Sequence, residues 1–446
     1  MFSRTDDIVE RDENVIGSVL KIRQFPLVAE SASGCRITDP EGKEYIDFTA
    51  SWAVANTGYC HPAIIRSVTE QLQKNSFASF TSILSEPTVC LAEEMIRRMP
   101  GEFDKKVFFG LSGSDANDCI TKMLPLATNR PRLISYFGAY HGQTMGSLAV
   151  SGHTAQAKFI GGGHVVKIPY PYCYRCAFGM KSETCNFHCI DFIEDHVFAS
   201  ICPPEDVGGI LAEAIQCDGG DIVPPKDYFK RLKNLCEKYG ILLVMDEVKI
   251  GIGRTGKFFG FEHFDVEPDA IVFGKPIASG MPLSGVIARS YILDSIIAGH
   301  LFTTAGNPVS AAAGIATLNV IDEENLIKKA HESGVYFLDQ LGELKKRYEL
   351  IGDVRGKGLV IGIELVKDRL KKNPASKEAA KICFRAYQKG LAVFYVGLHS
   401  NVLEITPPLI ISRKEIDQGL EILEESINDV LAGKISDEAI AKFAGW

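Results

Sequence analysis

A lysine and an aspartate, each placed where a short apolar run ends, are the residues of this sequence best suited to chemistry. Lys275 follows the apolar run at 270–273 and a glycine, and Asp246 follows the apolar run at 241–245. The lysine can form a Schiff base with an aldehyde, and the acid can keep a pyridine nitrogen protonated so that the ring accepts electrons. Two buried strands that deliver these groups therefore predict pyridoxal 5'-phosphate as the cofactor.

A candidate phosphate site lies where the apolar run at 106–109 leads through small residues into a helical pattern at 115–127. Backbone N–H groups at the start of a helix can bind an anion, and glycine allows the anion to come close. Gly113 and Ser114 are the best-placed donors, and Ser112 precedes them. The same residues also form an ordinary helix-capping sequence, so the phosphate hypothesis depends on the other motifs.

Tyr140 is a candidate for stacking on the cofactor ring. It follows the apolar run at 132–136, which ends another predicted strand. A flat aromatic at such a place can stack on a flat ring, although an aromatic core residue is the competing interpretation.

The elements that must position these residues alternate regularly. Between about 105 and 290, short apolar runs are separated by amphipathic helical patterns, which is typical of a mostly parallel sheet covered on both faces. The seven predicted strands lie at 106–109, 132–136, 165–168, 209–213, 241–245, 270–273 and 285–288. We therefore expect an α/β fold with one large domain built on a seven-stranded sheet.

The remaining residues predict a second, smaller α+β domain. Helical patterns lie at 308–325, 326–348, 377–389 and 413–431, and strand-like runs lie at 359–365, 391–395 and 402–405. A turn at 39–43 joins two short N-terminal strands at 34–39 and 44–48. We expect residues 1–60 to contribute to the small domain, 61–325 to form the large cofactor-binding domain and 326–446 to form the small domain.

Length and charge exclude several classes of protein. The chain has 446 residues, which is too long for one hydrophobic core, and a formal net charge of −8. It shows no basic stripe, which argues against nucleic-acid binding. The first residues are polar where a signal peptide would be apolar, and no apolar run approaches membrane-spanning length. We expect a cytoplasmic protein that does not bind a membrane and acts on a small molecule.

Four of the twelve cysteines form a cluster in the sequence. Cys173 and Cys176 make one pair, and Cys185 and Cys189 make a second pair that encloses His188. This spacing is compatible with a structural zinc site, but the second pair is looser than usual and no catalytic step needs a metal. Reduced thiols or a disulfide in a surface insertion are the favoured alternatives.

Seven short motifs occur in one order along nearly the whole chain. They are Ser112-Gly113-Ser114-Asp115-Ala116, Tyr140-His141-Gly142, Asp246-Glu247-Val248, Gly253-Arg254-Thr255-Gly256, Lys275 with Gly280-Met281-Pro282-Leu283, Thr303-Thr304-Ala305-Gly306-Asn307-Pro308 and Pro407-Pro408-Leu409. In this order the motifs resemble the class III aminotransferases, pyridoxal-phosphate enzymes of fold type I. The resemblance implies an obligate homodimer with active sites at the subunit interface, in which Thr303 reaches the phosphate of the neighbouring subunit's cofactor.

Three positions depart from the transaminating members of that family. Lys249, near the cofactor's phenolic oxygen, stands where those members usually have glutamine. Glu404 stands where they often have an arginine for the substrate carboxylate, and Asp218 where glutamate is common. An acid at 404 would repel a carboxylate, and an unmatched charge in a cleft is costly. We therefore expect a substrate with a neutral amide or lactam group in place of the carboxylate.

Within the family, the chain is most similar to the branch of α-amino-ε-caprolactam racemases and, somewhat less, isoleucine 2-epimerases. Racemisation needs a base on each face of a planar carbanion: Lys275 would serve one face and Asp218 the other, although Asp218 can also be read as a turn aspartate. Trp52 would wall the substrate pocket or, alternatively, pack at an interface. The predicted function is a racemase or epimerase of an amino lactam, amino-acid amide or neutral amino acid; the alternative is an aminotransferase that uses a keto acid.

Overall fold

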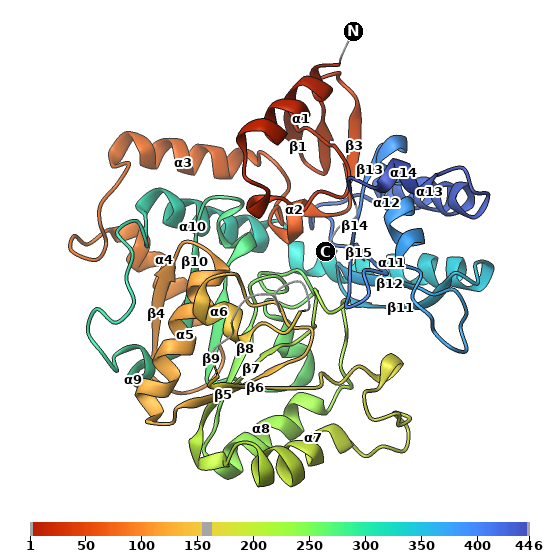
Figure 1. Ribbon diagram of the computed structural model, residues 1–446. Coiled ribbons are helices and arrows are strands. Elements are labelled where there is room, and N and C mark those ends of the chain that lie inside the picture. The colour runs from red at the N-terminus through yellow and green to blue at the C-terminus, as the bar shows by residue number, and fades with distance from the viewer. Residues whose placement is uncertain (1–2, 154–162, 444–446) are drawn as a thin grey trace.

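A seven-stranded sheet forms the centre of the larger part of the molecule (Figure 1). The structure is a computed structural model and describes residues 3–153 and 163–443. In sheet order the strands are β4 (Lys105–Gly110), β10 (Ser284–Arg289), β9 (Ala270–Phe273), β8 (Leu242–Asp246), β7 (Val207–Glu213), β5 (Arg132–Tyr136) and β6 (Val165–Ile168). Among these described strands, β10 runs antiparallel to both of its neighbours, β4 and β9, and all other neighbouring pairs are parallel. The seven strands expected from the apolar runs are thus confirmed.

Both faces of this sheet are buried, which explains why its strands read as nearly continuous apolar runs. Leu243 and Ile271 pack on the face covered by α8 (Tyr228–Tyr239) and α10 (Pro308–Glu323). Their neighbours in the chain, Val244 and Val272, pack on the opposite face, which α5 (Gly113–Thr128) covers. Side chains of a strand alternate between faces, so each short strand contributes to both layers of the core.

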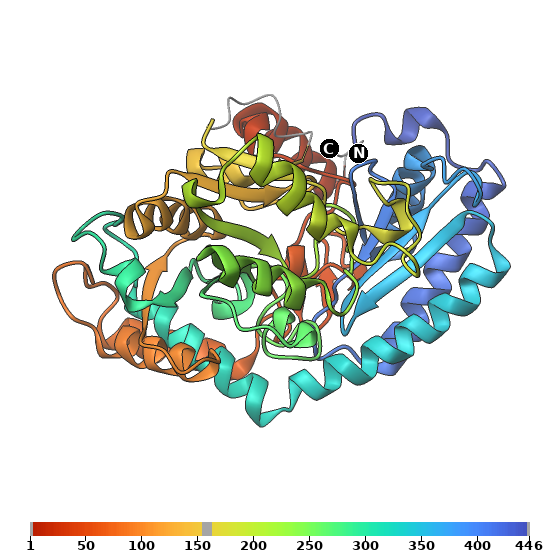
Figure 2. The same cartoon turned by 90° about the horizontal axis from the view of Figure 1, so that it is seen from below.

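The other helices of the larger part pack around these three. They are α3 (Pro62–Lys74) and α4 (Glu86–Arg98) against α10, α6 (Met145–Val150) and α9 (Ser290–Leu293) against α5, and α7 (His188–Phe192) against α8. The long helix α11 (Leu326–Arg347) follows α10 and packs on strand β11 of the smaller part (Figure 2). Within the described residues, no helix is long and apolar enough to cross a membrane.

Two four-stranded sheets make up the rest. One has the order β1 (Ser31–Ser33), β2 (Arg36–Thr38), β3 (Glu44–Asp47) and β13 (Leu391–Ala392); the other has the order β11 (Ile351–Lys357), β12 (Val360–Leu365), β15 (Val402–Ile405) and β14 (Phe394–Val396). The C-terminal β13 pairs with the N-terminal β3, so N-terminal strands do join the C-terminal third. The domain boundaries stay a prediction.

One strand prediction is wrong. The apolar run at 391–395 was expected as a single strand, but it changes sheets at Val393: Leu391 pairs with Ile46 of β3, whereas Tyr395 pairs with Leu403 of β15. The run is buried except for the half-buried Phe394, and burial alone makes a run apolar whichever strand it pairs with. The run therefore carries no signal for the change of partner.

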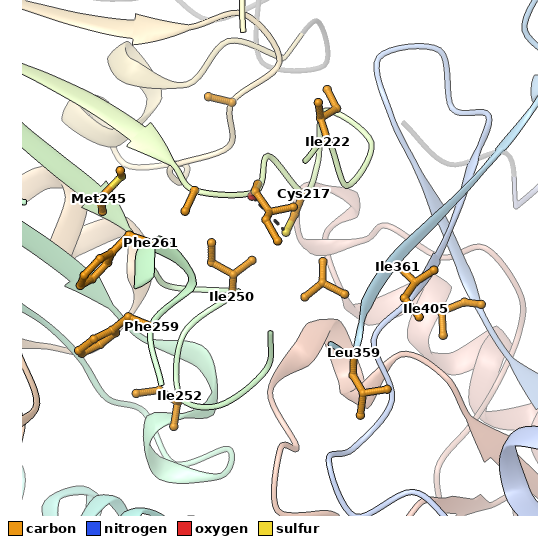
Figure 3. Close-up of a cluster of buried hydrophobic side chains, with 14 of the residues drawn as sticks. Cys217, Ile222, Met245, Ile250, Ile252, Phe259, Phe261, Leu359, Ile361 and Ile405 are labelled. Atoms are coloured by element: carbon orange, nitrogen blue, oxygen red, sulfur yellow. Dashed lines mark hydrogen bonds between the residues drawn. The ribbon is translucent and has the colours of Figure 1, made fainter. Parts of the chain in front are cut away.

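The helices that complete the described fold are α1 (Arg4–Val15), α2 (Ala50–Ala53), α12 (Ser376–Lys389), α13 (Arg413–Leu431) and α14 (Asp437–Ile440). One hydrophobic cluster joins the larger part to β12 and β15 (Figure 3). It includes Cys217 in the segment after β7, Ile250 after β8, Ile361 of β12 and Ile405 of β15. This cluster fixes β15, which carries Glu404, against the segments that follow β7 and β8.

Candidate active site

A cavity of about 330 Å³ lies where the strands of the large sheet end. In open α/β sheets, ligands bind outside the carboxyl ends of the strands, and the residues that line this cavity follow β4, β5, β7, β8 and β9. Eight of the eleven expected site residues line it: Ser112, Gly113, Ser114, Tyr140, Asp218, Asp246, Lys249 and Lys275. The fold thus brings together groups that are far apart in the sequence.

Asp246 is buried at the end of β8 and is held by three hydrogen bonds. Its Oδ2 atom accepts from Asn117 Nδ2 at 2.9 Å and lies 2.7 Å from His141 Nδ1, and its Oδ1 accepts from the backbone N–H of Val248 at 2.9 Å. An ionised carboxylate only accepts, so Nδ1 carries the histidine proton in this pair. The buried Nε2 of His141 has no hydrogen-bond partner among the described residues.

The N-terminus of α5 forms one wall of the cavity. Ser112 caps the helix: its hydroxyl accepts from the N–H of Asp115 at 3.4 Å, and the Asp115 carboxylate accepts from the N–H of Ser112 at 3.1 Å. The N–H groups of Gly113 and Ser114 have no partner inside the helix, as at any helix start. A Cβ on Gly113 would lie 2.7 Å from a methyl group of Val248, so only glycine fits there. This wall suits a bound anion.

Lys275 stands just after β9 with a positive φ of 35°, a strained backbone conformation for a residue with a side chain. Across the described ranges, its Nζ has no hydrogen bond or ion pair. Burial lowers the pKa of Lys275, and the nearby charge of Lys249 lowers it further. A larger fraction of the amine is therefore neutral and able to act as a nucleophile or a base.

Lys249, which lines the cavity, connects the cavity-lining Asp218 to Glu404 of β15. Its Nζ donates to Glu404 Oε1 at 2.5 Å and to Asp218 Oδ1 at 3.4 Å. Burial alone would lower the pKa of Lys249, but the carboxylates of Glu404 and Asp218 raise it well above its ordinary value. Glu404 therefore has a buried cationic partner, which the sequence reasoning did not include. The argument for an amide or lactam substrate loses most of its force.

Trp52, Thr303 and Glu404 do not line the cavity. The Trp52 ring stacks on Phe394 with centroids 4.5 Å apart, and Lys249 Nζ lies 5.2 Å from the Trp52 ring centroid. Trp52 thus lies behind the Lys249 wall. Thr303 is exposed, and its carbonyl accepts from Ser79 Oγ at 3.2 Å. Its expected role toward a neighbouring subunit's cofactor stays a prediction.

Four polar residues at the site had no role assigned from the sequence: Asn117, His141, Glu213 and Asp221. Glu213 ends β7, accepts from the N–H groups of Tyr140 and Cys217, and burial raises its pKa to about 7. Asp221 is fully buried, and neither carboxyl oxygen has a partner among the described residues. Burial, reinforced by the nearby carboxylate of Glu404, raises the pKa of Asp221 well above its ordinary value. The signal for Glu213 was present: an acid that ends an apolar run, as Asp246 does.

The clustered cysteines lie apart from this cavity. Cys173, Cys176, Cys185 and Cys189 are free thiols that line a second, small cavity together with His188. Within residues 3–153 and 163–443, no three potential ligands are placed to hold one metal ion. Whether the four thiols bind zinc stays a prediction.

The residues of the main cavity fit pyridoxal 5'-phosphate. The α5 N-terminus would hold the phosphate, Asp246 would face the ring nitrogen, and Lys275 would hold the aldehyde carbon. The glycine that Val248 requires at 113 and the unpaired Nε2 of His141 are both compatible with a flat, anionic group between these walls.

Comparisons with known proteins agree with this geometry. Residues 20–427 match the model of the aminotransferase class-III family. The chain is 43% identical to an alanine/serine racemase of Pyrococcus horikoshii, over 98% of this chain and 93% of the relative. It is 37% identical to an isoleucine 2-epimerase of Lentilactobacillus buchneri, over 99% of both chains. A solved Bacillus anthracis aminotransferase superposes with a TM-score of 0.89 at 30% identity, over 96% of this chain and 99% of that chain. The chain therefore belongs to the class III aminotransferase family of pyridoxal-phosphate enzymes.

Proposed function

We propose that this protein is a racemase or epimerase of neutral α-amino acids. The observation that carries the proposal is that Lys275 and Asp218, two side chains able to exchange a proton, line one cavity. Pyridoxal phosphate, when bound, withdraws electrons from the substrate's α-carbon and so makes its α-proton acidic. The protein must then remove this proton on one face and return one on the other.

Lys275 and Asp218 divide this work. The lowered pKa of Lys275, caused by burial and by Lys249, makes its released amine a competent base for one face. Asp218 serves the opposite face, and its Oδ1 accepts a hydrogen bond from Lys249 at 3.4 Å. Lys249 thereby orients the carboxylate of Asp218 while Glu404 holds Lys249 from behind.

Free neutral amino acids are the favoured substrates. Glu404 forms an ion pair with Lys249, which weakens its repulsion of a substrate carboxylate relative to an isolated acid. The relatives named above act on alanine, serine and isoleucine, which are free amino acids with uncharged side chains. Amino-acid amides and lactams remain the comparison substrates in the test.

We further propose that the active form is a homodimer. Thr303 lies on the exposed segment before α10, outside the chain's own cavity, where it is accessible to a second subunit. Analytical ultracentrifugation should give twice the mass of one chain, and a stable monomer with full activity would exclude this arrangement.

The test is to incubate the cofactor-loaded protein with one enantiomer of alanine, leucine or isoleucine, with no keto acid present, and to follow chirality by chromatography. Racemisation or epimerisation supports the proposal. The alternative, an aminotransferase, rests on relatives such as the 4-aminobutyrate aminotransferase of Escherichia coli, which is 38% identical. An enzyme of that kind would leave the enantiomer unchanged until a keto acid is added.

A further inference from the structure

The segment that carries Asp218, residues 216–222, is held in place by a buried arginine from another sheet. We propose that Arg355 of β11 is a positioning residue for Asp218, and that Glu364 of β12 holds Arg355 in turn. This inference rests on the proposed function, because it concerns the second proton-transfer group. We call residues 216–222 the Asp218 loop.

The Asp218 loop has a tightly turned backbone. Gly220 and Asp221 have positive φ values of 123° and 51°, and a Cβ on Gly219 would lie 2.2 Å from Gln216 Oε1. Inside the loop, the N–H groups of Gly220 and Asp221 both donate to the carbonyl of Cys217, and Gln216 and Ile222 exchange two backbone hydrogen bonds that close the loop at its base. Such tight backbone turns persist only where surrounding groups fix them.

Arg355 supplies a contact of that kind from outside the loop. Its Nε and Nη2 both donate to the carbonyl of Gly220, at 3.0 and 2.5 Å. The guanidinium is planar, so two bonds to one oxygen fix the carbonyl in direction as well as in distance. Gly220 is two residues from Asp218, whose own carbonyl accepts from the N–H of Gly397 at 3.0 Å. Arg355 and Gly397 thus hold the backbone next to the Asp218 side chain.

The arginine is itself fixed by buried charge. Arg355 Nη1 donates to Glu364 Oε2 at 2.8 Å, and the Glu364 side chain is 1% exposed. Glu364 Oε1 also accepts from Arg175 Nε at 2.5 Å, and the Tyr172 hydroxyl donates to Glu364. Tyr172 and Arg175 flank Cys173 in the cysteine-containing segment. That segment therefore contributes to the position of the Asp218 loop, which is a role that does not need a metal.

The decisive comparison is Arg355→Met against Arg369→Met. Arg369 also donates to backbone carbonyls, those of Ile351 and Tyr348, but neither residue lines the active-site cavity. Arg355→Lys is the conservative variant, because it keeps the positive charge beside Glu364. It loses the pair of hydrogen bonds to the Gly220 carbonyl. Each holoenzyme is given single enantiomers in heavy water. Inversion and α-proton exchange with retention are measured separately, and amide hydrogen exchange is measured across 216–222.

In Arg355→Met, we expect inversion to fall roughly 10²-fold, the effect of misplacing a reacting group by about 1 Å. Exchange with retention in the enantiomer that Lys275 serves should stay near the wild-type rate, and amide exchange in the Asp218 loop should become faster. Arg355→Lys should recover part of the inversion and decide the matter if the methionine variant does not fold. Arg369→Met should match the wild type.

Wild-type inversion with unchanged loop exchange in both Arg355 variants would overturn the proposal. Equal losses on both faces of the substrate would also overturn it, because a general structural role predicts that result. If the wild type inverts no amino acid, the proposed function fails, and amide exchange in the Asp218 loop still decides whether Arg355 holds it.

Discussion

The two walls of the cavity differ in how their charged groups are paired. On the cofactor wall, the Asp246 carboxylate is surrounded by three donors, and Ser112 caps the helix beside it. On the opposite wall, Lys249 is divided between Glu404 and Asp218, and Glu404 Oε2 has no partner among the described residues. On the first wall, both oxygens of Asp246 have donors, and the unpaired atoms among the described residues are His141 Nε2 and Asn117 Oδ1. On the second wall, two acids share one lysine and Glu404 keeps an unpaired oxygen, an arrangement that we relate to proton transfer at Asp218.

The largest expected effect on activity comes from removing the side-chain amine of Lys275. Lys275→Ala should lower activity by at least about 10⁴-fold and abolish the visible colour of the lysine-bound cofactor, because no other described lysine except Lys249 lines the cavity. Steady-state assays and absorbance spectra check this. Lys328→Ala, which changes an exposed lysine, should behave as the wild type. A coloured, active Lys275→Ala protein would remove Lys275 from the mechanism.

The most direct test of the cofactor wall is a substitution of Asp246. Asp246→Ala should weaken cofactor affinity by roughly 10²-fold or more, since losing one partner of a buried charge pair costs about 3–5 kcal/mol. Titration of the cofactor into the apoprotein measures this. Asp269→Asn alters another buried acid, paired with Lys233 and Arg289, and should leave cofactor affinity intact. Equal affinity losses in both variants would mean that Asp246 acts only through stability.

The role of the opposite wall, which contains Lys249, is tested by Glu404→Gln. Glu404 is the main group that raises the pKa of Lys249 against the effect of burial, so the variant should lower that pKa. The alkaline limb of the pH–rate profile should move down by about 1–3 pH units. Glu425→Gln removes an exposed ion pair with Lys389 and should leave the profile unchanged. An unmoved alkaline limb in Glu404→Gln would show that the charge of Lys249 is not needed.

The smallest effect concerns stability. Burial raises the pKa of Glu213 to about 7, above the ordinary value of 4.5, so the folded state holds a proton there that the unfolded state has lost. The free energy of unfolding should therefore fall as pH rises from about 4.5 to 7, by at most about 1.4 kcal/mol per pH unit from this group. Glu213→Gln should flatten the dependence of Tm on pH, whereas exposed Glu237→Gln should not. A profile that stays equally steep in Glu213→Gln would assign the dependence to other groups.

The difference between the walls also explains what the sequence could predict. Strands that are buried on both faces appear in the sequence as apolar runs. The sequence therefore predicts the sheet and the position of Lys275 and Asp246 at its strand ends. The pairing of Lys249 with Glu404 is not predicted, because it joins residues from two sheets whose contact no local pattern records. The change of sheet at Val393 was hidden for the same reason.

The central claim is that Asp218 serves the face of the substrate opposite Lys275, and Asp218→Asn in heavy water tests it most directly. The variant should keep its cofactor and lower inversion by roughly 10²–10⁴-fold, the usual contribution of a positioned acid–base group. Exchange of the α-proton with retention should persist for one enantiomer, through Lys275. Inversion at the wild-type rate in Asp218→Asn would contradict the two-base assignment.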